Sequence, residues 1–237
     1  MRHELAEKGC VLIPAYNEGE WIAAVVRDVL EVCPNVIVVD DGSPDNTADV
    51  ARDAGATVVL VQNPNQGKGA ALNRGFEHAR QQGYEFVVTI DGDGQHATDD
   101  IPAFIDAYAQ GIPVVIGNRM SDTATMPFVR RLTNRFMSWL ISRKMGQRVP
   151  DTQNGFRLYK TSVIPEMQTG SQRFAAESEI LLELASNGVK VGAVPIKVIY
   201  RDEKSKINPI KDTYRFFKML RDWEQRNKGE KVEKLKG

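Results

Sequence analysis

The chain has 237 residues, of which 42% are hydrophobic, 26% charged and 8% aromatic. This composition is typical of a globular protein with a sizeable core and excludes a largely disordered chain. The 31 basic and 31 acidic residues cancel, so the net charge gives no reason to expect a nucleic-acid-binding protein.

The charges are unevenly distributed along the chain. Residues 1–112 carry 7 Lys or Arg against 18 Asp or Glu, whereas residues 113–237 carry 24 against 13. We therefore expect the second half to face an anionic partner. Cys10 and Cys33 are too few for a disulfide framework and are predicted to be small buried side chains. We expect neither a signal peptide nor a spanning helix, so any membrane contact is predicted to be at the surface.

The first half alternates short apolar runs with amphipathic stretches. The apolar runs predict strands at 10–14, 35–41, 57–62, 84–91 and 112–118. The amphipathic stretches predict helices at 18–31, 46–54, 68–82 and 98–110. This alternation is typical of an α/β protein with a mostly parallel central sheet flanked by helices. Such sheets bind ligands beyond the carboxyl ends of their strands.

The second half loses this rhythm. It contains a basic amphipathic stretch at 127–148, a polar turn at 151–157, a helix around 177–186 and a strand at 190–200. A basic and aromatic stretch at 209–223 precedes a charged tail that we expect to fray. No linker, repeat or low-complexity segment interrupts the sequence, which predicts one domain with an appended basic region.

Polar residues follow the first two predicted strands. Pro14 ends the first strand and places Tyr16 in a loop, where its ring can contact a nucleobase. Asp40 and Asp41 leave the second strand together, and one carboxylate can accept hydrogen bonds from a base or a ribose. The alternative is an ordinary loop in which Asp45 or Asn46 caps the next helix.

The third strand is followed by Gly67, Lys68 and Gly69 at the start of a predicted helix, where backbone amides attract anions. The segment is not a Walker A motif, because Gln62 stands at the place of its first glycine. The alternative for Lys68 is an ordinary surface lysine.

The fourth strand is followed by the sequence IDGDGQH, which places Asp91, Asp93, Gln95 and His96 close together. Two carboxylates this close are unfavourable unless a cation lies between them. Mg²⁺ or Mn²⁺ bound to a nucleotide diphosphate is the predicted occupant, because both ions prefer carboxylate and phosphate oxygen. An EF-hand is excluded, because Pro102 stands where its loop needs a glutamate.

These motifs occur in a fixed order along the chain: IPAYNE, VVDDGSPD, NQGKGAAL, DGDGQH, GNR, DTQNGFR, RFAAESE and RDEKSK. The ordered set resembles the inverting family 2 glycosyltransferases of the GT-A fold, close to dolichyl-phosphate mannosyltransferases and related polyprenyl-phosphate glycosyltransferases. The resemblance runs from about Val11 to Leu220. It implies a single Rossmann-like GT-A domain at 1–225 and a charged tail at 226–237. Within the domain, a nucleotide-sugar half covers about 8–118 and an acceptor- and membrane-facing half covers about 119–225.

The resemblance also assigns roles to individual residues. The nucleoside and sugar nucleotide would be bound by Pro14, Tyr16, Glu18, Val39, Asp41, Lys68, Asp91, Gly92 and Asp93. The metal ligands would be Asp91, Asp93 and Gln95, and the catalytic set would be Asp91, Asp93, Arg119 and Arg131. The acceptor phosphate would be bound by Arg119, Arg131, Arg201 and Lys206. The chain departs from the commoner pattern at Asn118 and Asn154, and its 201–206 loop is shorter than in the animal mannosyltransferases.

The implied reaction is transfer of a hexose, first mannose from GDP-mannose and second glucose from UDP-glucose, to a polyprenyl or dolichyl phosphate. The implied cofactor is Mg²⁺ or Mn²⁺. The expected location is peripheral, on the cytoplasmic face of a membrane, and a small membrane-anchoring subunit is a further candidate partner. The alternatives are a hydroxyl acceptor, a catalytically silent nucleotide-binding scaffold at a membrane, and a nucleic-acid-binding module, which no recognised motif supports.

Two further points remain open in the sequence. Glu177 and Glu179 are the candidate general bases, and the alternative is a pair favoured by the dipole at a helix N-terminus. The stretches 127–148 and 209–223 combine basic and aromatic residues and are expected to lie on anionic lipid. The alternative for 127–148 is a core helix with solvated arginines.

Overall fold

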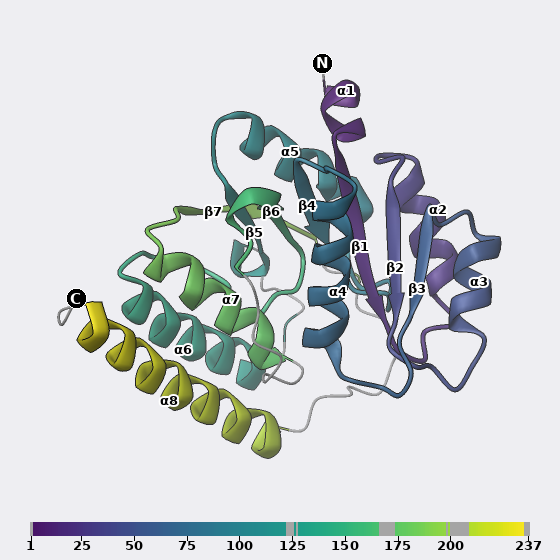
Figure 1. Ribbon diagram of the computed structural model, residues 1–237. Helices are drawn as coiled ribbons and strands as arrows, with labels where there is room; N and C mark the ends of the chain where they lie inside the picture. Colours follow the sequence, from purple (N-terminus) through teal and green to yellow (C-terminus); the bar gives the residue numbers. More distant parts are fainter. Residues whose placement is uncertain are drawn as a thin grey trace.

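A seven-stranded sheet forms the centre of the protein (Figure 1). The computed structural model describes residues 2–121, 126, 128–165, 174–197, 199 and 209–234. The strands are β1 (Gly9–Ala15), β2 (Val36–Asp40), β3 (Val58–Val61), β4 (Phe86–Thr89), β5 (Val114–Asn118), β6 (Arg157–Lys160) and β7 (Val191–Pro195). Their spatial order is β3-β2-β1-β4-β6-β5-β7.

Most neighbouring strands are parallel, which confirms the predicted fold class. β1 pairs in parallel with β2 and β4, and the pairs β2–β3 and β5–β7 are also parallel. Strands β1 and β2 are buried along their whole length, as continuous Val and Ile runs predict. Because β2, β1 and β4 are neighbours that run in the same direction, the loops that follow them meet at one edge of the sheet.

Helices cover both faces of the sheet. One face carries α1 (Arg2–Glu7), α2 (Ile22–Leu30), α3 (Thr47–Asp53) and α5 (Ile101–Ala109), whose apolar residues share one core with the sheet. The other face carries α4 (Lys68–Gln81), α6 (Phe128–Met145), α7 (Phe174–Ser186) and α8 (Pro209–Lys234), which share the second core. Figure 1 shows α6, α7 and α8 grouped beside the sheet, with α8 on the outside. Three short 3₁₀ turns complete the described elements: η1 (Thr98–Asp100), η2 (Arg119–Ser121) and η3 (Thr161–Val163).

The structure differs from the predicted elements most clearly at β6, α2 and α8, and the strand predicted at 190–200 ends at Pro195. Residues 157–160 form β6, which is antiparallel to both of its neighbours, whereas the sequence predicted only a polar turn that ends at Arg157. Helix α2 begins at Ile22, not at Glu18, because the residues before it form a separate turn, in which Trp21 N–H and Ile22 N–H both donate to the Glu18 carbonyl at 2.9 Å. Helix α8 continues to Lys234 and so crosses the predicted boundary between domain and tail.

Cys10 and Cys33 are buried free thiols, as predicted. None of the helices in the described ranges is both long enough and apolar enough to cross a membrane.

Candidate active site

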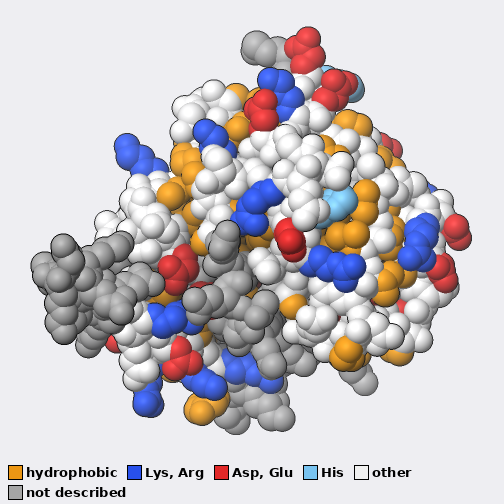
Figure 2. All heavy atoms as spheres, in the orientation of Figure 1, with side chains coloured by type: hydrophobic (Ala, Val, Ile, Leu, Met, Phe, Trp, Pro, Cys, Tyr) orange, Lys and Arg blue, Asp and Glu red, His pale blue; other side chains and the backbone are white. Residues whose placement is uncertain are grey.

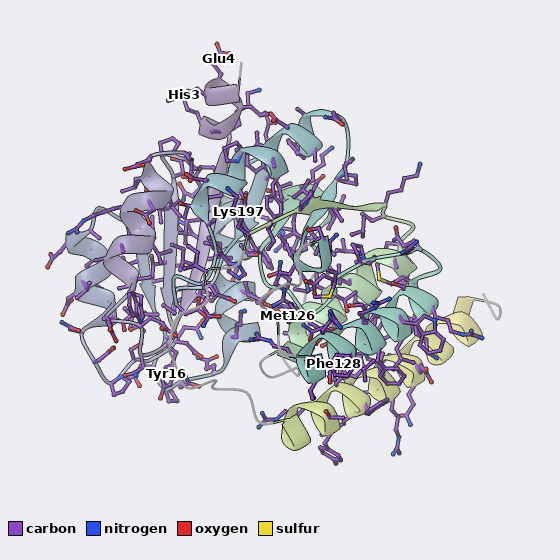
Figure 3. The ribbon with its side chains drawn as sticks, turned by 180° about the vertical axis from the view of Figure 1, so that it is seen from behind. His3, Glu4, Tyr16, Met126, Phe128 and Lys197 are labelled. Atoms are coloured by element: carbon purple, nitrogen blue, oxygen red, sulfur yellow. The ribbon has the colours of Figure 1, made fainter. Side chains whose placement is uncertain are left out.

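The first two loops at the carboxyl edge of the sheet are fastened to each other. Asn17 N–H donates to Ser43 Oγ at 2.9 Å, and Gly19 N–H donates to Asp45 Oδ2 at 3.1 Å. Tyr16 stands out from this pair of loops with 47% of its surface exposed, and Figure 3 shows it at the lower end of the sheet. Pro14 still belongs to β1 and pairs with the buried Val39 of β2. The predicted nucleoside residues of β1 and β2 therefore lie at one edge, with Tyr16 open to solvent.

Asp41 holds the loop before α4. Its Oδ1 accepts hydrogen bonds from Gln62 Nε2 at 2.9 Å and from Gln66 N–H at 2.8 Å. Its Oδ2 accepts one from Gly67 N–H at 2.7 Å. Asp41 is only 3% exposed, so its carboxylate fixes the start of α4 and hence the position of Lys68. The predicted contact of Asp41 with the nucleoside stays a prediction.

Lys68 joins two carboxylates from distant parts of the chain. Its Nζ lies 2.5 Å from Asp91 Oδ1, after β4, and 2.6 Å from Glu177 Oε1, on α7. Burial by itself would lower the pKa of Lys68, but the two carboxylates outweigh it and raise the pKa above its ordinary value. Burial by itself would raise the pKa of Asp91, but the nearby Lys68 and His96 outweigh burial and hold this pKa well below its usual range. Lys68 is therefore not the ordinary surface lysine that the sequence also allowed.

Gly155 has no room for a side chain beside this cluster. A Cβ on Gly155 would lie 2.7 Å from Glu177 Oε1, 3.0 Å from Lys68 Nζ and 3.2 Å from Asp91 Oδ1. The glycine of the DTQNGFR segment thus lets the backbone after the predicted polar turn pack directly on the three charged groups. The sequence prediction assigned no role to this glycine.

Asp93, Gln95 and His96 form the corner next to Lys68. Asp93 Oδ1 accepts a hydrogen bond from Gln95 N–H at 3.0 Å, and His96 Nε2 lies 3.7 Å from Asp91 Oδ2. Burial, and then the charge of Asp91, raise the pKa of Asp93. In the described part of the chain no three His, Cys, Asp or Glu side chains gather as a complete metal site.

A divalent cation nevertheless fits this corner through Asp93. The carboxylate is partly buried beside a like charge and has one hydrogen bond in the described residues, so a cation would relieve its repulsion from Asp91. Mg²⁺ in proteins is commonly held by one or two carboxylates and completed by substrate phosphates and water. Asp91 is less available than the sequence implied, because Lys68 already occupies its Oδ1.

Arg119, which directly follows β5, forms a buried ion pair with Asp151. Arg119 Nε donates to Asp151 Oδ2 at 2.7 Å and Nη2 donates to Oδ1 at 3.0 Å, an arrangement with two parallel hydrogen bonds. Asp151 is 0% and Arg119 8% exposed. The structure therefore fixes Arg119 through a partner that the sequence prediction did not single out.

The remaining arginines are distributed differently. Arg157 is fully buried and donates to the carbonyl oxygens of Asn154, Glu177 and Thr152, which joins β6 to α7. Arg131 lies in the first turn of α6 and lines a groove along that helix. Figure 3 shows that Phe128, at the start of α6, lies toward the same lower edge as Tyr16. Arg201 and Lys206 lie outside the described residues.

Both candidate bases are engaged in ion pairs. Glu177 is 3% exposed and pairs with Lys68, and Glu179 pairs with Arg226 of α8. The structure thus brings Glu177 to the predicted donor residues but turns Glu179 toward α8.

Comparison with known proteins supports this description. Residues 10–167 match the family described as Glycosyl transferase family 2. Glycosyltransferase AglJ of Haloferax volcanii is 35% identical over 86% of this chain and 67% of its own length. The UDP-N-acetylglucosamine–dolichyl-phosphate N-acetylglucosaminyltransferase of Methanococcus voltae is 30% identical over 81% of this chain and 86% of its own length. The polyprenol monophosphomannose synthase of Mycolicibacterium smegmatis is 29% identical, with shares of 83% and 79%.

Solved structures share the fold. Glucosyl-3-phosphoglycerate synthase from Mycobacterium tuberculosis, crystallised with Mn²⁺, UDP and glucosyl-3-phosphoglycerate, superposes with a TM-score of 0.64 at 18% identity, over 85% of this chain and 75% of that one. At this identity the likeness concerns the fold alone. The family match covers well over half of the chain and includes the loops that carry Tyr16, Asp41, Lys68, Asp91 and Asp93. The chain therefore belongs to glycosyl transferase family 2.

Proposed function

We propose that this protein transfers a hexose from a nucleotide sugar to a polyprenyl or dolichyl phosphate, with inversion and without a covalent enzyme intermediate. The names of two relatives support the acceptor class, since one states a dolichyl phosphate and the other a polyprenol monophosphomannose product. The same names differ in the sugar. We propose GDP-mannose as the first donor to test, followed by UDP-glucose.

The state of the two candidate bases carries the proposal. A sugar hydroxyl is a poor nucleophile at neutral pH and needs a positioned general base. Glu177 and Glu179 are both committed to ion pairs. A phosphate monoester has a second pKa of about 6 and is mostly dianionic at pH 7, so it can attack without losing a proton to the protein. This favours a phosphate acceptor over a hydroxyl acceptor.

We assign the roles of the chain's own residues accordingly. Asp93, with Gln95, would hold Mg²⁺ or Mn²⁺, which when bound would neutralise charge on the departing nucleotide. Tyr16 is exposed at the donor edge and would stack on the nucleobase. Asp41 orders the backbone amides at the start of α4, and Lys68 holds the Asp91 carboxylate in place.

The acceptor phosphate must approach an anionic donor, so it needs cationic guidance. Arg119 and Arg131 would supply it, together with Arg201 and Lys206, and planar guanidinium groups suit phosphate oxygens. The guanidinium of Arg119 is held in one orientation by Asp151, which would reduce the entropy lost when a phosphate binds.

We propose that α6 and α8 rest on the cytoplasmic face of a membrane. On α6, Phe128 is 67%, Leu132 59% and Trp139 54% exposed, and on α8 Tyr214 is 70% exposed. Figure 2 shows basic side chains over α8, where the described ones are Arg215, Lys218, Arg221 and Arg226. Exposed aromatic and basic residues on one helix favour an in-plane position on anionic lipid.

The membrane contact is tested by flotation with vesicles that contain anionic lipid at low salt. The double variant Leu132→Asp and Trp139→Asp should lose flotation, whereas Val61→Asp, at an exposed apolar residue of β3, should retain it. Equal flotation of both variants would contradict the assigned surface.

The transfer reaction is tested with labelled GDP-mannose, UDP-glucose and UDP-N-acetylglucosamine in the presence of Mn²⁺. Each donor is offered with a polyprenyl phosphate and, in parallel, with the corresponding polyprenol, which differs only in the phosphate. Label should enter the lipid phosphate and not the alcohol. Faster transfer to the alcohol would overturn the acceptor assignment, and no transfer from any donor would favour the silent scaffold. Arg131→Ala should lower the rate, with Arg27→Ala on α2 as the matched control.

A further inference from the structure

A groove runs along α6. Its volume is about 810 Å³, which is within the range of small-molecule sites. Helix α6, the loop at 146–150 and the end of β5 line it. The side chains that matter below are Arg131, Arg135, Trp139, Ser142, Arg143 and Arg148.

The groove has an unbalanced positive charge. Arg131, Arg135, Arg143 and Arg148 line it, and among the residues that the structure describes no acidic side chain does. In the described ranges none of the four has a carboxylate partner, whereas the adjacent Lys144 is paired with Glu224 of α8. Four like charges around one groove repel one another, and a bound anion would relieve this repulsion.

The helix dipole explains only part of this charge. Basic residues are favoured in the last turn of a helix, and the effect falls off within that turn. It accounts for Arg143 and Lys144, which precede the end of α6 at Met145. It does not account for Arg131 and Arg135 near the start of the helix, nor for Arg148 beyond its end.

The wall that presents Arg148 is rigidly built. Gly146, at φ 67°, ends α6 in the left-handed conformation. Ser142 Oγ donates to the Val149 carbonyl at 3.1 Å and accepts from Val149 N–H at 2.9 Å. Gln147 donates to the Val189 carbonyl at 3.0 Å and accepts from Val191 N–H at 3.1 Å. The loop is therefore preorganised before any ligand binds.

The two ends of the groove are too far apart for one phosphate monoester. Arg131 and Arg143 are twelve residues apart on α6, which corresponds to about 18 Å along the axis at the usual helical rise. An acceptor phosphate at Arg131 therefore leaves the Arg143 and Arg148 end unfilled.

An apolar row next to the groove indicates the source of the second anion. Four exposed apolar side chains recur at helical spacing on α6: Phe128, Leu132, Phe136 and Trp139. The last three each come one residue after a residue that lines the groove, namely Arg131, Arg135 and Ser138. Trp139 belongs to both rows, and the Arg143 guanidinium lies over its ring at 5.9 Å. A free phosphate would not use this apolar surface, whereas the acyl chains of a lipid would.

We propose that the Arg143 and Arg148 end of the groove binds the phosphodiester headgroup of an anionic membrane glycerophospholipid, distinct from the acceptor lipid. The site would orient α6 on the bilayer, with the acyl chains along Trp139 and Phe136. The proposal rests on the membrane-facing role proposed above and adds a specific ligand to it.

The experiment uses a lipid that stays monomeric, so that headgroup binding is measured without a bilayer. Binding of dihexanoyl-phosphatidylglycerol to the full chain is followed by calorimetry. Dihexanoyl-phosphatidylcholine, glycerol 3-phosphate and inorganic phosphate are compared as ligands. The Arg143→Gln and Arg148→Gln double variant is compared with Arg27→Gln, an exposed arginine on the opposite face of the sheet. Melting temperatures verify that both variants are folded.

Phosphatidylglycerol should bind more tightly than the three other ligands. The double variant should weaken its binding at least about tenfold, because charge-assisted hydrogen bonds are lost at two guanidinium groups, and Arg27→Gln should not. Equal binding of free phosphate would overturn the lipid assignment. Undetectable binding of phosphatidylglycerol, unchanged binding by the double variant, or equal weakening by the control would overturn the site. Transfer by the wild type is assayed separately, so a failure of the proposed transferase function is distinguishable from a failure of this site.

Discussion

Removing the negative charge of Asp151 should destabilise the protein strongly. Asn has nearly the same shape as Asp, so Asp151→Asn removes the carboxylate charge that pairs with the buried Arg119 guanidinium. Loss of one partner of a buried ion pair costs about 3–5 kcal/mol, and the pair here has 0% and 8% exposure with two parallel hydrogen bonds. We therefore expect the free energy of unfolding to fall by about 3–5 kcal/mol.

The measurement is equilibrium unfolding in guanidinium chloride with linear extrapolation. Glu224→Gln is the matched control, because it breaks the partly exposed pair with Lys144 and should cost less than about 1 kcal/mol. The double variant Arg119→Met and Asp151→Leu should recover most of the loss, since apolar replacement of a buried pair is often tolerated. A loss for Asp151→Asn no larger than that of the control would refute the reasoning.

Three further predictions concern the site. Asp93→Asn should lower the transfer rate on the order of 10²-fold, measured at saturating donor over a Mn²⁺ titration; an unchanged Mn²⁺ dependence would contradict the metal assignment. Gly155→Ala should leave a folded protein with impaired transfer, because its Cβ would lie 2.7 Å from Glu177 Oε1; melting temperature and initial rate separate the two effects. Lys68→Met should raise the KM for the donor, whereas Lys68→Arg should retain part of the affinity, and equal effects of both would argue against a charge-based role.

The central sheet and the donor edge could be predicted because their signals are local. Continuous Val and Ile runs identify buried strands, and the direction of parallel strands brings the loops at Asp41 and Asp91 to one edge. Strand β6 gave no such signal, because its four residues begin with an arginine. Arg157 can be fully buried there only because carbonyl oxygens from separate segments accept its hydrogen bonds.

The ion pairs of the site, Arg119 with Asp151 and Lys68 with Glu177, could not be predicted from the sequence, because their partners are far apart along the chain. Asp151 lies 32 residues from Arg119, and Glu177 comes to Lys68 only through the packing of α7 on α4. Spacing along the chain carries no information on such pairs. The glycine of DTQNGFR, Gly155, was the one available sign, since such a glycine often marks a place where another group approaches the backbone closely.

The charge gradient along the chain acquires a physical meaning at the site. At the donor corner the Lys68 ammonium pairs with the carboxylates of Asp91 and Glu177. Asp93 adds a third carboxylate beside them, so the carboxylates outnumber the cation. This corner alone would repel an anionic diphosphate, so we expect donor binding to depend on a divalent cation. The groove along α6 has the opposite charge and would attract an anionic lipid phosphate without a metal.

Chelation should therefore weaken binding of the nucleotide sugar and leave binding of the lipid phosphate unchanged. Separate calorimetric titrations of the two ligands, with and without EDTA, would measure this. If EDTA weakened binding of both ligands equally, the donor corner and the α6 groove would not differ in their need for a metal, and the reasoning would be wrong.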